Sequence, residues 1–151
     1  LSPQALADRQ MQTRRFETSD AKQMVIAASA VLQDLGFVLE ETEIPLGLLV
    51  GAKTRDAMSA GQVMGSFALA LLGVYQPMDK TQTLRASMVM RQLTDSNGNE
   101  INASTVRVTF QRIIVNTAGS VSRLEQINDP AVYQDFFERL SKSVFLEAQE
   151  I

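Results

Sequence analysis

Three glutamates that lie close together in the sequence, Glu40, Glu41 and Glu43, are the residues best suited to chemistry. Neighbouring carboxylates can bind a cation or act as a general acid and base. Successive side chains of a β-strand point to opposite faces, so at most Glu41 and Glu43 share one face. We therefore expect a solvated strand face at this cluster, with no metal and no catalytic residue.

The residue types on which most enzymes depend are missing, because the chain contains no His and no Cys. Their absence removes the commonest general base, the Ser-His-Asp arrangement, the usual zinc ligands and thiolate chemistry. The phosphate-binding patterns Gly-x-x-x-x-Gly-Lys-Ser/Thr and Gly-x-Gly-x-x-Gly are also absent. The sequence predicts no enzyme and no cofactor. A hydrolase built on carboxylates alone is the remaining enzymatic hypothesis, and no residue is singled out for it.

Basic side chains offer a different chemistry, the binding of anionic groups. Arg85, Arg91 and Arg107 are predicted to share one face of a sheet with Thr109 and Gln111, because all five fall on the polar side of alternating strands. Such a strip could meet an acidic partner or anionic lipid headgroups, although an ordinary solvated sheet face is the simpler interpretation. A smaller basic cluster near the N-terminus is interpreted as a solvated edge: Arg9, Arg14 and Arg15.

The longest stretch without a charged side chain covers residues 57–78, between Asp56 and Asp79. A helix from residue 56 to about residue 73 would span ~27 Å, close to the hydrocarbon thickness of a membrane. The four polar side chains and three glycines of residues 57–78 make this stretch a weak membrane span. A helix buried in the core of a domain is the favoured interpretation.

The same stretch also fits a helix that packs against a partner or against a second copy. Gly61 and Gly65 would lie one turn apart on one face, so that another backbone could approach closely. The candidate interface residues on this predicted helix are Gly61, Met64, Gly65, Phe67, Ala68 and Leu72.

The length and composition of the chain are those of an ordinary globular domain. Its 151 residues, 45% of them hydrophobic and 21% charged, suit one domain with its own core. The net charge of −3, with both signs interspersed, argues against a nucleic-acid-binding surface. We expect a flexible lead-in over residues 1–10 and a single α+β domain over residues 11–151.

Two helices should pack on the sheet. The first is expected to begin at Thr18, Ser19 or Asp20, any of which can cap it, and to end at Gly36. Gln23 follows Asp20 at the capping-box distance. Asp129 and Pro130 open the last helix, whose aromatic stripe is predicted to cover the sheet.

Alternating residues predict strands over 11–16, 37–43, 48–53, 82–93, 105–115 and 120–127. Asn97 and Gly98 should supply the positive φ angles of the turn at residues 95–99. The predicted fold is an antiparallel sheet of about five to six strands, packed by these helices, with the central apolar helix inserted between its halves.

Several segments resemble a proteobacterial family of cell-envelope lipoproteins with no assigned activity. The segments are QTRRFET (12–18), VLQDLGF (31–37), LG (46–47), KTRDA (53–57), VRVTFQR (106–112) and YQDFFERLS (133–141). The resemblance implies a location on the periplasmic side of the cell envelope. It also implies a lipidated cysteine just before or at the start of the mature chain, which would anchor the protein in the outer membrane. This sequence starts at Leu1 and has no Cys, so the anchor is expected to be removed or absent. A more distant likeness, on residues 21–43, is to helix-grip domains of a lipoprotein of the outer-membrane barrel-assembly machinery and implies the fold only.

Two functional hypotheses follow. The first is a non-enzymatic envelope protein that binds another protein or itself. The second is a carrier that holds a lipid or another apolar small molecule between sheet and helices. Its adaptable lining would come from Met24, Met58, Met64, Met88 and Met90.

Overall fold

The computed structural model describes residues 2–54, 79–116, 118 and 120–149. In chain order the elements are α1 (Pro3–Met11), β1 (Thr13–Phe16), α2 (Ala21–Asp34), β2 (Val38–Glu43), the short 3₁₀ helix η1 (Ile44–Leu46), β3 (Leu48–Thr54), β4 (Asp79–Thr94), β5 (Glu100–Asn116), β6 (Val121–Gln126) and α5 (Pro130–Gln149). The six strands form one open antiparallel sheet in the order β1-β5-β4-β3-β2, with β6 also paired to β5. The predicted α+β fold is confirmed, while the predicted central helix lies outside the described residues.

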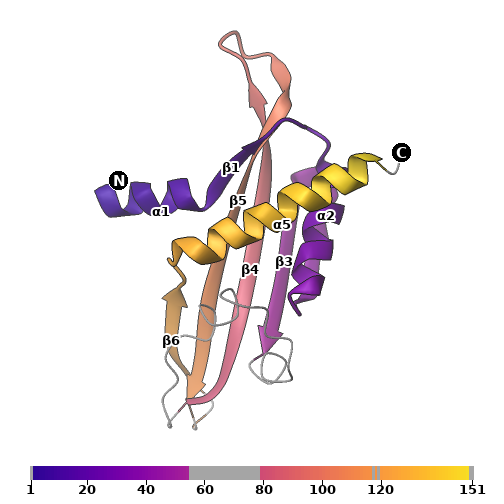
Figure 1. Cartoon of the computed structure of the whole chain (residues 1–151). Coiled ribbons are helices and arrows are strands. Elements are labelled where there is room, and N and C mark those ends of the chain that lie inside the picture. Colours follow the sequence, from indigo (N-terminus) through magenta and orange to yellow (C-terminus); the bar gives the residue numbers. More distant parts are fainter. Residues whose placement is uncertain (1, 55–78, 117, 119, 150–151) are drawn as a thin grey trace.

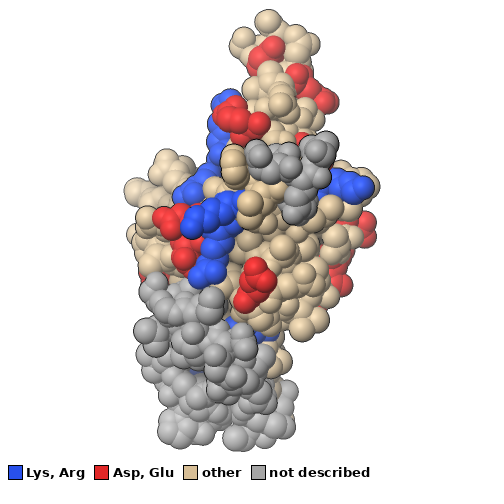
Figure 2. Space-filling view, turned by 45° about the vertical axis from the view of Figure 1, so that its right-hand side comes forward, with Lys and Arg blue, Asp and Glu red and all other residues tan. Residues whose placement is uncertain are grey.

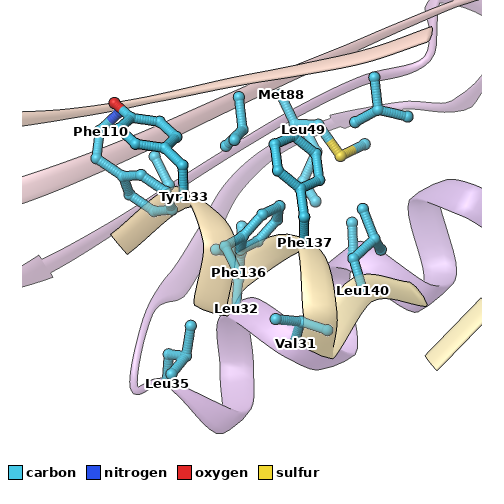
Figure 3. Packing of buried hydrophobic residues seen from close by; sticks show 14 of the residues in the cluster. Val31, Leu32, Leu35, Leu49, Met88, Phe110, Tyr133, Phe136, Phe137 and Leu140 are labelled. Atoms are coloured by element: carbon cyan, nitrogen blue, oxygen red, sulfur yellow. The ribbon is translucent and has the colours of Figure 1, made fainter. Parts of the chain in front are cut away.

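Helices α2 and α5 cover the same face of the sheet (Figure 1). Phe110 of β5 lies at the centre of the layer between them, with its ring 6.2 Å from that of Phe37, 5.5 Å from that of Tyr133 and 5.6 Å from that of Phe136. Figure 3 shows the side chains of α5 pointing toward the sheet and toward α2. The predicted role of the aromatic stripe on the last helix, to cover the sheet, is therefore confirmed.

Helix α2 begins and ends where the sequence predicts. The Asp20 carboxylate accepts the backbone N–H of Gln23 at 3.0 Å, which satisfies one of the free donors of the first turn. Gly36 takes a φ of +93°, and the N–H of Phe37 then donates to the carbonyl of Leu32 at 2.9 Å. These contacts form the Schellman ending that a glycine at this position favours.

The N-terminal residues form a helix that was not expected from the sequence, because α1 occupies most of residues 1–10. The Ser2 hydroxyl accepts the N–H of Ala5 at 3.1 Å, and Pro3 stands in the first turn, where its missing N–H has no cost. The pair Ser2-Pro3 is thus a helix start. The predicted strand over residues 11–16 is confirmed with a later beginning, at Thr13.

The turn between β4 and β5 also differs in detail from the prediction. Among the described residues only glycines have a positive φ, so Gly98 takes it at +82° and Asn97 does not. The Asp95 carboxylate accepts the N–H groups of Asn97 and Asn99, both at 2.9 Å. This side chain closes the loop at the predicted residues 95–99, and both strands extend further toward it than expected.

Strands β4 and β5 extend past their neighbours in the sheet. The last residue of β4 paired with β3 is Val89, and the last residue of β5 paired with β1 is Ser104. Beyond Val89 and Ser104 the two strands continue as a projecting hairpin, seen at the top of Figure 1. We call residues 93–103 the arm.

Candidate binding surface on the open face of the sheet

The sheet face opposite α2 and α5 carries the polar alternating residues of β4 and β5. The register places Arg91 beside Thr105, Val89 beside Arg107, Ser87 beside Thr109, and Arg85 beside Gln111. The prediction that Arg85, Arg91 and Arg107 share one face with Thr109 and Gln111 is therefore confirmed. We call this side of the sheet the open face.

A groove of about 870 Å³ lies between α1 and the open face. One wall comes from the segment that leads from α1 into β1, and the floor comes from three neighbouring strands. The lining residues are Ala5, Asp8, Arg9, Gln12, Thr13, Ser87, Val89, Arg91, Thr105, Arg107, Thr109, Gln111 and Gln126. The groove exists because the N-terminal residues form a helix, which the sequence reasoning missed. The signal that would have found it is the Ser2-Pro3 helix start.

A buried glutamine orients one of the groove's arginines. Gln12 is 3% exposed, and its side-chain oxygen accepts from Nε of Arg107 at 3.3 Å and from Nη2 at 3.2 Å. The backbone carbonyl of Gln12 also accepts the N–H of Val108 at 2.9 Å, so that the glutamine is held at the sheet edge. The guanidinium of Arg107 is thereby positioned in advance of any ligand.

The groove is more basic than the protein as a whole. Among its lining residues Arg9, Arg91 and Arg107 are positive and only Asp8 is negative, although the chain carries a net charge of −3. Like charges gathered in a concave site attract anionic groups. Of the N-terminal basic cluster, only Arg9 lines the groove. Arg14 stacks over the Phe137 ring at 4.9 Å, and the guanidinium of Arg15 pairs with Glu17 at 2.8 Å.

An apolar strip runs beside the basic residues on the same open face. Leu48 pairs with Val89, and Ala52 pairs with both Val38 and Arg85, which places these side chains together. Val38 is 71% exposed and Val89 is 47% exposed. The strip consists of Val38, Leu48, Val50, Ala52 and Val89.

The three glutamates lie at the outer edge of the open face. Glu41 pairs with Val50 and Glu43 with Leu48, so these two share a face as predicted, while a shift of register leaves Glu40 unpaired with β3. All three are exposed. In the part of the chain that the structure describes, no three His, Cys, Asp or Glu side chains gather closely enough to hold a metal ion.

A buried lysine lies on the other side of the sheet, beneath the end of α2. Lys53 is 4% exposed, and its ammonium donates to the carbonyl of Leu35 at 2.6 Å. Burial lowers the pKa of Lys53 from its usual 10.5. The contact places a cation at the negative end of the helix and satisfies one of its terminal carbonyls. Lys53 thus has a structural partner and no access to the groove's lining.

No protein-family model matches the chain, and neither does any curated protein. The resemblance to envelope lipoproteins therefore stays a prediction from the sequence segments given above.

The interface residues that the sequence singled out lie outside the described part of the chain: Gly61, Met64, Gly65, Phe67, Ala68 and Leu72. Two of the methionines of the carrier hypothesis, Met58 and Met64, also lie there. The other three are core residues, with Met24 and Met88 fully buried and Met90 7% exposed. Among the described helices, none has both the length and the apolar character of a membrane span.

Proposed function

We infer that this protein is a non-enzymatic binding protein that receives a protein partner on the open face of its sheet. Through its resemblance to envelope lipoproteins, we place it on the periplasmic side of the cell envelope, anchored in the outer membrane. The observation that carries the inference is the groove of about 870 Å³, with three arginines, beside an apolar strip that contains two exposed valines.

The composition of this face supports a protein as the partner. Antiparallel sheets with one solvated face normally alternate apolar side chains inward with polar side chains outward. Here Val38 and Val89 break that alternation at the surface. Clustered exposed apolar side chains next to a polar rim are typical of protein interfaces, in which Arg is enriched. The acidic edge at Glu41 and Glu43 completes a face that is negative on one side and positive on the other.

The chemistry of the groove supports a role without catalysis. Its lining has a single carboxylate, Asp8, and the chain has no His to act as a base near neutral pH. The alternative, a carrier for a lipid, has weaker support. Met24 and Met88 pack inside a continuous core cluster, which favours a filled core over a ligand cavity.

Photo-crosslinking from the open face tests this proposal. A photoreactive residue at Val89 should give a discrete crosslinked species with a protein partner in envelope extracts, because Val89 lies between the groove and the apolar strip. The same residue at Glu138, exposed on α5 on the opposite side of the sheet, is the matched control. The Val89 species should disappear when Arg91→Glu is added. Equal crosslinking at both positions, or none at Val89, would contradict the proposal.

A further inference from the structure

The arm is a preorganised acidic projection. Residues 94–100 are all exposed, and the only charged residues of the arm are Asp95 and Glu100. The projecting end at the top of Figure 2 accordingly shows acidic side chains. At its base, Asn102 accepts from the backbone N–H and the hydroxyl of Ser19 at 3.1 and 2.9 Å. An isolated two-stranded hairpin is only marginally stable, and these contacts hold the arm in one shape.

The arm and the groove are complementary in charge and in polarity. The arm contributes two carboxylates, and the groove contributes three guanidinium groups against one carboxylate. The tip residues between the two acids are small and polar, and the groove floor is rich in hydroxyl and amide groups. Complementary charge fixes the orientation of a docked element, and a preformed loop loses little conformational freedom on binding.

The arm of a copy cannot enter the groove of that same copy. Arg91 stands at the end of the groove nearest the arm, and β4 continues from it away from the groove toward Thr94. The arm therefore extends outward along the strand direction, as Figure 1 shows. An arm that fills a groove has to come from a second molecule.

We propose that the partner on the open face is a second copy of this chain, whose acidic arm docks into the basic groove. This inference rests on the proposed function, since it names the protein that the open face receives. Arm and groove are different surfaces, so two copies either exchange arms and close as a dimer or associate head-to-tail into a ring or a filament. In a head-to-tail assembly, each molecule uses its arm toward one neighbour and its groove toward the other.

Reversing the charges on each side separately tests the proposal. The arm variant is Asp95→Lys with Glu100→Lys, and the groove variant is Arg9→Glu with Arg91→Glu, which leaves the contact between Arg107 and Gln12 in place. Sedimentation velocity should show that the wild-type mass rises with protein concentration and that each variant alone stays monomeric. An equimolar mixture should associate again, because the intact groove of one variant accepts the intact arm of the other.

Two controls separate this effect from a general effect of charge. Asp34→Lys with Glu138→Lys changes the net charge as much as the arm variant does, at exposed sites on α2 and α5 opposite the open face, and should leave association unchanged. Wild-type association should weaken when salt rises from about 0.01 M to about 1 M, because the Debye length falls from about 30 Å to about 3 Å. Thermal melts confirm that each variant is folded.

The outcomes also distinguish this inference from the proposed function. A wild type that stays monomeric throughout, or a mixture that fails to associate, overturns the arm-to-groove contact. If crosslinking from Val89 then still captures a different protein and depends on Arg91, the proposed function stands. If a photoreactive residue at Val89 gives a crosslinked dimer of the purified protein, and the arm variant gives no such dimer, the proposed function and the arm-to-groove contact both hold.

Discussion

The hydroxyl of Tyr133 accepts the backbone N–H of Phe110 at 3.2 Å, in the place where a neighbouring strand would otherwise accept it. Strands β1 and β6 pair with the same edge of β5, one up to Arg107 and the other from Gln111, which leaves a gap between them. The Tyr133 hydroxyl fills this gap and donates in turn to the carbonyl of Ile127 at 2.6 Å. A side chain from α5 thus joins the two strands where the sheet edge changes partner.

Removing this hydroxyl should destabilise the protein without disturbing the ring packing. Tyr133→Phe keeps the aromatic contact with Phe110, whose ring centroid is 5.5 Å away. It leaves the Phe110 N–H and the Ile127 carbonyl buried without this partner, at a cost of about 1–3 kcal/mol. Urea denaturation measures the free energy of unfolding. An unchanged value would mean that another group satisfies this edge of β5.

The same residue should make stability depend on pH in the alkaline range. Burial raises the pKa of Tyr133 above its usual 10.0 and outweighs the hydrogen bonds from Phe110, Gln12 and Gln126, which lower it. Below pH 10 this group is protonated in both the folded and the unfolded chain and adds no pH dependence. Above it, the unfolded chain loses the proton first, so the free energy of unfolding falls as pH rises.

Comparison of wild type with Tyr133→Phe isolates this contribution, because every other titrating group is common to both. The difference in free energy of unfolding should be constant from about pH 7 to about pH 9 and should shrink above about pH 10. A difference that stays constant up to about pH 11 would show that the hydroxyl titrates as an exposed tyrosine does.

Lys53 should produce a pH dependence of the opposite sign. Its ammonium is buried against the Leu35 carbonyl, and burial lowers its pKa below 10.5. As pH rises toward 10.5, the folded chain releases this proton before the unfolded chain does, so the free energy of unfolding of the wild type rises relative to that of Lys53→Met. Parallel denaturation curves from about pH 7 to about pH 10 measure the difference. If the difference in free energy of unfolding between wild type and Lys53→Met does not change with pH, a lowered pKa of Lys53 in the folded chain is contradicted.

Local signals in the sequence account for much of the fold. Asp20 and Gly36 each act through hydrogen bonds to residues within four positions, so the limits of α2 can be predicted from a short segment. The alternation along β4 and β5 places the arginines on one face for the same reason. The arrangement of the groove depends on contacts between distant residues. Gln12 reaches Arg107 only because β1 pairs with β5, and no local pattern encodes that pairing.

The two glycines Gly36 and Gly98 provide a matched pair for the final prediction. Both have a positive φ, +93° and +82°, where a side chain is strained. A Cβ at Gly98 would have no atom within 4 Å, whereas a Cβ at Gly36 would lie 3.0 Å from the ammonium of Lys53. Gly98→Ala should therefore cost about 1 kcal/mol, from backbone strain alone.

Gly36→Ala should cost more than Gly98→Ala, because the added Cβ would crowd the Lys53 ammonium, which the Leu35 carbonyl holds at 2.6 Å. Gly36→Val should cost at least as much, since a β-branched residue resists a positive φ further. Thermal and urea unfolding of the three variants give the order. If the two alanine variants lose equal stability, the Lys53 side chain accommodates the added methyl group without a cost. Crowding between the new Cβ and Lys53 can be tested as the cause of the extra loss of stability in Gly36→Ala. Adding Lys53→Met should lower the cost of Gly36→Ala to that of Gly98→Ala. The reason is that the shorter, uncharged side chain does not have to stay within reach of the Leu35 carbonyl.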